Sequence, residues 1–415
     1  MPYNEYNDDE NIPILALFNL RLTSKTLGEA ATQVLLQDAH ITWPICRWSS
    51  FFTTSIENAV LAPSSTFAPN IKKIRFEFAT RWLDWHGTGP STYRDPFLIS
   101  NQHDNEPYMQ ARFLIDNLPD ILKSMPRLQS LQLETPTWKS KGEIIPYAPD
   151  LDCVMLAALT HGLIDGLVIA NLEGLTTLDL KLPCTHDFLE LSEKLSDATC
   201  NRLRHLGIGI TDATGENGHR GYIQHATRER DNDDTYPASS LQKQYPNSVY
   251  NDGVFELVAR CRNLITLEVS GTHYLNGSSL VLPDLLITLK LRRIRFDASY
   301  LGTLLSQVSK IYLDDVELTT GFWNDVWKIL LLCPSLTYLE TRLCTYARSN
   351  PHAPGVRNWL LRCDDNPDIV TPLDDEYGEY EGLREVIKML VKRAGGREFY
   401  PAEYTIVDDL DHLSS

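Results

Sequence analysis

The groups in this chain best suited to chemistry are its glycine-rich turns, histidines, cysteines and acidic pairs, and they complete no catalytic motif. Gly207-Ile-Gly209 follows an apolar run, as in a dinucleotide-binding loop, but an aspartate stands at position 212, where the third glycine would fall. Gly87-Thr-Gly89-Pro-Ser91 lacks the lysine of a phosphate-binding loop. The sequence contains neither a Gly-x-Ser-x-Gly nucleophile motif nor a His-Glu-x-x-His zinc motif. We therefore expect no catalytic residues, no cofactor and no metal, and a protein that is not an enzyme.

Composition narrows the class of partner. Asp plus Glu number 55 against 38 Lys plus Arg, a net charge of −17, which argues against a nucleic acid or an anionic membrane as the partner. No apolar run approaches the roughly 18 residues that a membrane span needs. The eight cysteines form no Cys-x-x-Cys pair, and the first eleven residues are acidic and polar, unlike a secretory signal. We expect reduced thiols and an intracellular location, cytoplasmic or nuclear.

One short pattern, apolar-x-x-apolar-x-apolar, recurs through the chain and predicts the strands that position everything else. Four copies begin at 264, 286, 308 and 336, which gives steps of 22, 22 and 28 residues. Further copies begin at 71, 128, 175 and 203, and residues 40–43 would form the first strand. The longer steps between copies must contain insertions or degenerate units.

Helical runs precede several of these strands. Val254, Phe255, Leu257 and Val258 fall on one helix face and lead to Cys261-Arg-Asn-Leu264, and residues 326–333 repeat this arrangement. This resembles the cysteine-containing class of leucine-rich repeats, whose units read Cys-x-x-Leu-x-x-Leu-x-Leu. The resemblance implies an α/β fold: an irregular solenoid over 41–363, with parallel strands on its concave face, helices outside, and a short helical segment at its N-terminus.

Residues 13–40 form that N-terminal segment, after a tail at 1–12. Leu20-Arg-Leu22, Leu27 and 29–36 resemble the second half of an F-box of fungal type, the domain that docks on the Skp adaptor of a cullin ubiquitin ligase. The Leu-Pro helix that opens an F-box is replaced by Ile12-Pro13-Ile14-Leu15, so either the chain begins late or adaptor binding has been lost. The resemblance implies adaptor contacts by Leu15, Leu20, Leu22 and Leu27. The alternative is an amphipathic helical cap that covers the first repeat.

Two insertions and a C-terminal region complete the organisation. Residues 79–109 are rich in aromatics, and Trp82 and Trp85 are either anchors for a partner or side chains folded back onto the scaffold. Residues 211–252 are polar and predict a loop. Residues 364–415 contain an acidic linker, an amphipathic helix over 381–394 expected to cap the array, and a tail.

The alternation of each strand selects the residues that would face outward on the concave side. Those expected to contact a protein partner are Arg75, Gln132, Asp179, Glu268, Lys290, Tyr312, Tyr338 and Glu340. Asp314-Asp315 beside a strand end is expected to be solvated. The leading hypothesis is a substrate-recognition subunit of an SCF-type ubiquitin ligase. The runner-up is a leucine-rich-repeat interaction protein without a ligase link, and an enzyme assembled from distant residues is third.

Overall fold

The recurring apolar-x-x-apolar-x-apolar pattern supplies the buried rows of side chains that cross the sheet. The computed structural model describes residues 38–44, 68–79, 116–134, 153–211, 245–347, 349–351, 361–363 and 379–393. Within them lies one eleven-stranded sheet, ordered β1 to β8 and then β10 and β11, with β9 pairing to both β7 and β10. The strands are β1 Asp38–Pro44, β2 Lys73–Ala79, β3 Ser130–Glu134, β4 Thr177–Leu182, β5 His205–Ile210, β6 Thr266–Asn276, β7 Thr288–Asp297, β8 Lys310–Asp314, β9 Glu317–Thr320, β10 Tyr338–Tyr346 and β11 Leu361–Cys363.

Every strand expected from the pattern is found in this sheet, at matching register. All neighbouring strands pair in parallel except β10 and β11, which are antiparallel. The middle apolar position of the pattern forms one cross-strand row, and each of its members is buried: Ile74, Leu131, Leu178, Leu206, Leu267, Leu289, Ile311 and Leu339. A slip of one residue would turn such a row to the opposite face, so this burial fixes the register.

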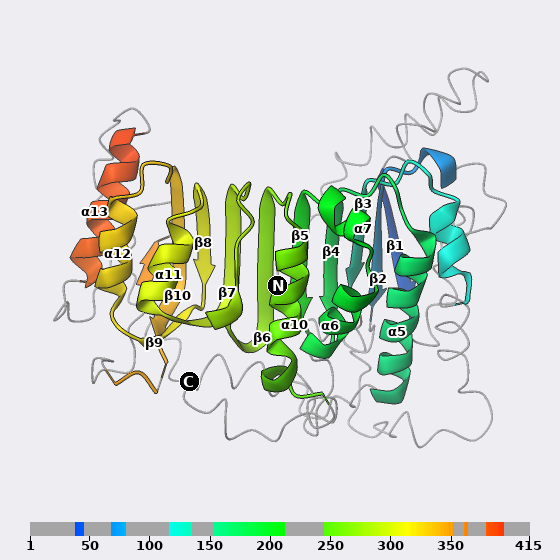
Figure 1. Ribbon diagram of the computed structural model, residues 1–415, viewed down its shortest axis with the longest axis horizontal. Coiled ribbons are helices and arrows are strands. Elements are labelled where there is room, and N and C mark those ends of the chain that lie inside the picture. Colours follow the sequence, from blue (N-terminus) through cyan, green and yellow to red (C-terminus); the bar gives the residue numbers. More distant parts are fainter. Residues whose placement is uncertain are drawn as a thin grey trace, which may run out of the picture.

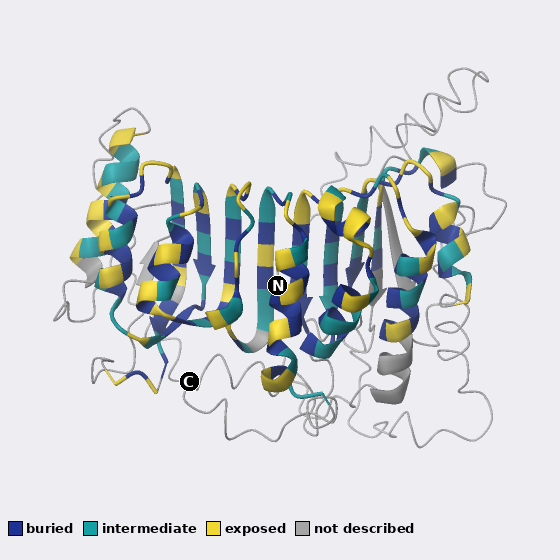
Figure 2. Cartoon of the chain, in the orientation of Figure 1, coloured by how far each residue is buried: buried dark blue, intermediate teal, exposed yellow. Residues whose placement is uncertain are grey.

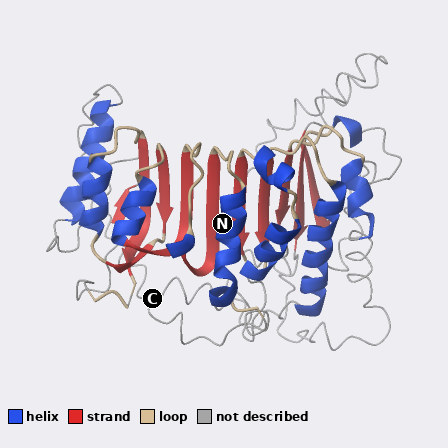
Figure 3. Cartoon of the chain, in the orientation of Figure 1, coloured by secondary structure: helices blue, strands red, loops and turns tan. Residues whose placement is uncertain are grey.

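Helices connect successive strands and lie along one side of the sheet (Figures 1 and 3). Residues 116–123 are helical, and the helices that follow are α5 Cys153–Ala170, α6 Thr185–Lys194, α7 Asp197–Arg202, α10 Asn247–Arg260, α11 Ala298–Leu305, α12 Trp323–Leu331 and α13 Glu379–Arg393. Two short 3-10 turns occur at Ala68–Asn70 and Gly277–Ser279. Figure 2 shows the alternation of buried and less buried residues along the strands that this one-sided covering produces. Among the described helices, none combines the length and apolar character that a membrane crossing requires.

The chain bends within β7 and again just after β8, and a second set of strand pairings lies beyond these bends. Arg293 and Asp315 adopt positive φ angles of 55° and 57° at equivalent places in neighbouring units. Beyond them, β9 pairs with the last residues of β7 and of β10. The Arg293 Nε donates to Asp315 Oδ2 at 2.9 Å, and both side chains are 5% exposed. The expectation that Asp315 is solvated is therefore wrong, because the bend turns it inward, where Arg293 and the Tyr274 hydroxyl meet its carboxylate.

The predicted helix over 381–394 is present as α13, which packs against α12. Leu383 and Val386 are fully buried at that contact. Gly382 lets the two helices approach, since a Cβ there would lie 3.0 Å from Trp327 Cδ1. Arg393 Nη1 donates to the carbonyls of Cys333 and Leu336 at 2.6 and 3.3 Å, at the turn that follows α12.

Two predicted boundaries differ from the structure. The strand β1 begins at Asp38, so it starts inside the segment assigned to the F-box-like helices. The polar insertion expected over 211–252 is wrong at its end, because α10 begins at Asn247. Asn247 and Asn251 are polar but buried, and they bond to Thr185 of α6 and to the backbone of Asn276, which composition could not indicate. Residues 80–109 and 212–244 lie outside the described residues.

Candidate interaction face

The face of the sheet opposite the helices carries the predicted partner-binding residues in one line. The register places Arg75, Gln132, Asp179, Gly207, Glu268, Lys290, Tyr312 and Glu340 on successive strands from β2 to β10, each beside the next. We call these eight residues the central row. Seven of them were predicted from the alternation, and the eighth predicted residue, Tyr338, lies one row away. Their role in binding a partner stays a prediction.

Ion pairs link most charged residues of this face. Glu134 accepts from Arg75 and from Lys181, each at 3.1 Å, and is itself mostly buried. Lys290 lies 3.3 Å from Glu268 and also over the Tyr312 ring, at 5.5 Å from its centroid. These contacts pair charges of both signs across strands, so the face has no uniform field that would attract a polyanion.

Further along the same face, Arg292 pairs with Asp314 at 3.2 Å. The Tyr312 and Tyr338 rings lie 4.9 Å apart, and the Tyr338 hydroxyl donates to Glu340 at 3.0 Å. Tyrosine and arginine side chains on a rigid frame are the types most often found where proteins recognise each other.

At the centre of the face, β5 places glycine where its neighbours carry side chains. Gly207 lies between Asp179 and Glu268, and Gly209 lies between Lys181 and Ser270. The Asp179 carboxylate leans over this gap, because a Cβ added to Gly207 would be 2.5 Å from its Oδ1. Burial raises the pKa of Asp179, and the positive charge of Lys181 opposes this rise only in part. The sequence around Gly207-Ile-Gly209 suggests only a comparison with a nucleotide loop and does not indicate that Gly207 lies between two carboxylates.

The other predicted contact residues are outside the described ranges. They are the proposed adaptor contacts Leu15, Leu20, Leu22 and Leu27 and the proposed loop anchors Trp82 and Trp85.

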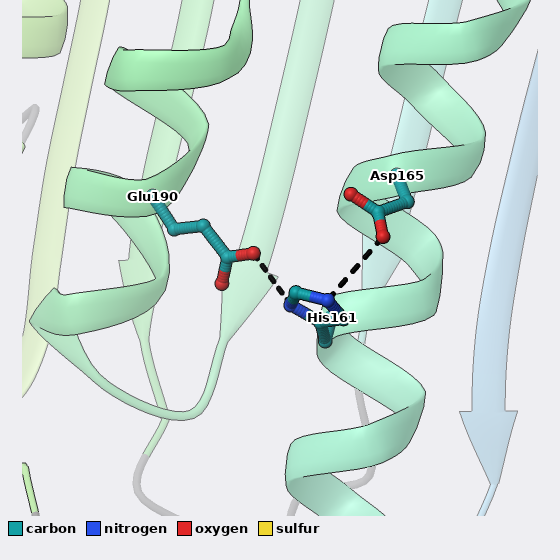
Figure 4. Close-up of side chains that lie close together, drawn as sticks. All are labelled: His161, Asp165 and Glu190. Atoms are coloured by element: carbon teal, nitrogen blue, oxygen red, sulfur yellow. Dashed lines mark ion pairs between the residues drawn. The ribbon is translucent and has the colours of Figure 1, made fainter.

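One cluster on the helical side has the composition of a metal site. His161 and Asp165 on α5 face Glu190 on α6, and their possible ligand atoms lie within 4.8 Å of one another (Figure 4). However, the imidazole uses both nitrogens: Nδ1 lies 2.5 Å from Glu190 and Nε2 lies 3.3 Å from Asp165. A metal would need one of these nitrogens to face both carboxylates.

Lys194 already serves as the cation of this cluster. Its Nζ lies 2.6 Å from Asp165 and 2.5 Å from Glu190. Burial would lower the pKa of Lys194, but the hydrogen bonds to these two carboxylates outweigh it and raise the pKa. The His161 cluster is therefore best explained as an ion-pair network that joins α5 to α6.

A cleft of about 570 Å³ lies beside this network, between the end of α5 and the α6–α7 connection. Its lining is mixed: leucines 167, 172, 175 and 195 are apolar, and Glu173, Lys194 and Arg202 are charged. The hydroxyls that line it, Ser196 and Thr199, bond to each other at 2.9 Å instead of to a histidine or carboxylate base. Neither hydroxyl of this cleft is therefore placed as an activated nucleophile.

Comparison with known proteins adds no assignment to this geometry. No family model matches the chain, and no curated protein is significantly similar to it. The functional interpretation therefore depends on the sheet face and on the residues that form it.

Proposed function

We propose that this protein is a leucine-rich-repeat scaffold that binds a protein target through the uncovered face of its sheet. The proposal draws support from three successive apolar positions per unit that enter one shared interior. The first of them is buried in every unit from Ile71 to Leu336, and the second forms the buried row described above. The third forms another buried row, which runs from Phe76 to Leu313 and ends in Thr341 of β10, its one polar member. Successive stacking of such units is the property that defines a solenoid.

Three cysteines support the assignment to the cysteine-containing class of repeat. Cys200, Cys261 and Cys333 stand at the ends of α7, α10 and α12, each three residues before a buried leucine that leads into a strand. The neighbouring Cys261 thiol lowers the pKa of Cys200, although burial opposes this, which indicates that the thiols of successive units lie close together. The Cys200 unit repeats the same Cys-x-x-Leu-x-x-Leu-x-Leu spacing, although it was not recognised as such from the sequence alone.

The observation that carries the proposal is the central row. Residues from seven separate strands, chosen only by alternation, lie on one continuous face with the helices on the other. Their mixture of charged, amide and aromatic groups matches a protein surface better than a polyanion.

We further propose that the scaffold is a substrate-recognition subunit of an SCF-type ubiquitin ligase. This part draws on the F-box resemblance of residues 14–36, which precede β1 in the chain. The chain itself carries out no covalent step in this proposal. It brings the target close to the ligase and so raises the effective concentration of the target there.

A scaffold without a ligase link is the second candidate. The specific observation in its favour is the opening of the F-box-like segment, where Ile12-Pro13 replaces the Leu-Pro helix. In that case residues 14–36 serve only to cover the end of the apolar interior.

A pull-down with a purified Skp adaptor distinguishes the two. The full chain should retain the adaptor, and the double substitution Leu20→Asp and Leu27→Asp should abolish retention, since it places charges on the apolar helix face. Glu268→Gln, on the sheet face, is the control and should leave retention unchanged. If the intact, folded chain fails to retain the adaptor, the ligase proposal is wrong and the second candidate replaces it.

A further inference from the structure

Gly207 and Gly209 occupy two outward-facing positions of β5 and carry no side chains there. We call the space above them the gap over Gly207 and Gly209. In the two outward-facing rows that cross β5 here, the neighbouring strands carry Asp179 and Lys181 on one side and Glu268 and Ser270 on the other. Strands in a sheet are about 4.8 Å apart, so the residues that flank each glycine are about 10 Å from each other across β5. No side chain of β5 separates these flanking residues, and the Asp179 carboxylate leans over Gly207.

Asp179 differs from the other carboxylates of the face. Glu134, Glu268 and Asp314 each have a basic partner within 3.3 Å, and Glu340 accepts a hydrogen bond from the Tyr338 hydroxyl. Among the described residues, no ion pair or hydrogen bond reaches the side-chain carboxylate of Asp179. Its neighbour in the central row on β3 is the neutral Gln132, and Lys181 is directed instead to Glu134.

The surroundings of Asp179 make a cation favourable there. Burial raises the pKa of Asp179, and the nearby charges of Glu268 and Glu134 add to the rise, while Lys181 and Arg75 oppose it. A partly desolvated carboxylate without a counter-ion gains more from a new charge-assisted hydrogen bond than an exposed one does.

We propose that the gap over Gly207 and Gly209 receives an arginine or lysine side chain from an extended segment of the protein partner, with Asp179 as its principal acceptor and Glu268 as its second. This proposal names the partner chemistry of the face and rests on the proposed function. The planar guanidinium of arginine suits a shallow gap with an acceptor on each side, because it presents donors in a fixed fork.

Charge complementarity selects this occupant over the alternatives. The chain has a net charge of −17, so a second copy or another acidic protein would be repelled at long range. A metal ion is a poorer fit, because Asp179 and Glu268 supply oxygen ligands from two strands only, and calcium takes six to eight such ligands. A basic segment satisfies the unpaired carboxylate without any rearrangement of the sheet.

The test is a selection of phage-displayed random peptides on the immobilised full chain, followed by affinity measurement on the selected peptides. We expect them to share an arginine or lysine at one position and to bind Asp179→Asn at least about tenfold more weakly. Gly209→Ala should also weaken binding, because its added methyl group fills part of the gap; the nearest atom, 3.0 Å away, is the flexible Lys181 Cγ, so the fold should tolerate it. Asp314→Asn, a paired carboxylate on the same face, is the matched control and should leave affinity unchanged.

Several results overturn the inference. These are a failure to select peptides, selected peptides without a shared basic position, or affinities that do not respond to Asp179→Asn while circular dichroism shows that variant to be folded. A dimer of the chain that Asp179→Asn dissociates, detected by light scattering, would assign the gap to a second copy instead. The adaptor pull-down keeps the two proposals separate. If the chain retains the adaptor but binds no basic peptide, only this inference is wrong. If it binds basic peptides but does not retain the adaptor, only the ligase proposal is wrong.

Discussion

Two arginine–aspartate pairs stand side by side in the sequence and differ strongly in burial, and the buried pair also receives the Tyr274 hydroxyl, so a comparison of the two measures what the bend in the sheet contributes. Arg292 pairs with Asp314 on the open face, where the side chains are 58% and 31% exposed. The residues that follow these two in the sequence form the second pair, Arg293 with Asp315, where both side chains are 5% exposed. The perturbation is the same at both sites, Asp314→Asn and Asp315→Asn.

The expected effects differ several-fold. An exposed pair contributes about 0.2–1 kcal/mol, so Asp314→Asn should lower the free energy of unfolding by less than about 1 kcal/mol. Removal of one partner from a buried pair costs about 3–5 kcal/mol, because the remaining charge stays desolvated. Asparagine tolerates the positive φ of 57° at position 315, so backbone strain is not part of the difference. Asp315→Asn should therefore cost about 3 kcal/mol.

Urea unfolding followed by tryptophan fluorescence and far-ultraviolet circular dichroism measures both variants. Arg293→Met combined with Asp315→Asn completes a double-mutant cycle, and the double variant should be more stable than the sum of the single effects by at least about 1.5 kcal/mol. The reasoning is refuted if Asp315→Asn costs no more than Asp314→Asn, or if the cycle at the buried pair shows no coupling.

Two further predictions concern pH and the end of the array. Burial raises the pKa of Asp187 to about 6, from 3.8, while its carboxylate accepts the Cys184 backbone N–H at 2.9 Å. The proton on Asp187 stabilises the folded state, and this contribution to the free energy of unfolding is complete below pH 3.8 and lost as pH rises through about 6. Asparagine does not titrate, so Asp187→Asn should gain stability relative to the unmodified chain by up to about 3 kcal/mol between pH 4 and 7. Parallel denaturation curves at several pH values measure this, and a constant difference would contradict it. Leu383→Ala should destabilise α13 by about 2–5 kcal/mol, seen as faster hydrogen exchange in α13, whereas the exposed Glu385→Ala should change stability by less than about 0.5 kcal/mol.

The strands and their register were predictable because a single pattern carries both. Residues such as Leu267, Leu289 and Ile311 recur at nearly constant spacing, and an apolar side chain every second residue must turn to the same interior. The helices before β6 and β10 were predictable for the same reason, since their apolar faces have helical spacing.

The bend and the helices of the middle of the chain were not predictable in this way. The helix α5 lies in a gap between two strand matches, and its mostly apolar sequence gives no distinct polar and apolar faces to read. Arg293, Asp315 and Glu317 look like surface residues in sequence. Their burial depends on ion pairs across strands, Arg293 with Asp315 and Glu317 with Arg295, that the sequence does not indicate.

The candidate interaction face was also predictable from the sequence only in part. Alternation was sufficient to choose the central row, because period-two spacing decides which face a residue occupies. It could not indicate that Asp179 lacks a counter-ion or that Gly207 lies beside it, since both depend on which strands become neighbours across a separation of 28 residues.

The reversed direction of β11 has a consequence for the assembly of copies of this protein. A sheet of parallel strands exposes at each end an edge that another copy could extend in the same direction, and repetition of that contact would build a filament. Because β11 runs antiparallel to β10 and pairs at Thr341 and Cys344, it occupies the edge where a parallel newcomer would have to align. This single short strand should therefore act as a stop against end-to-end polymerisation of the sheet.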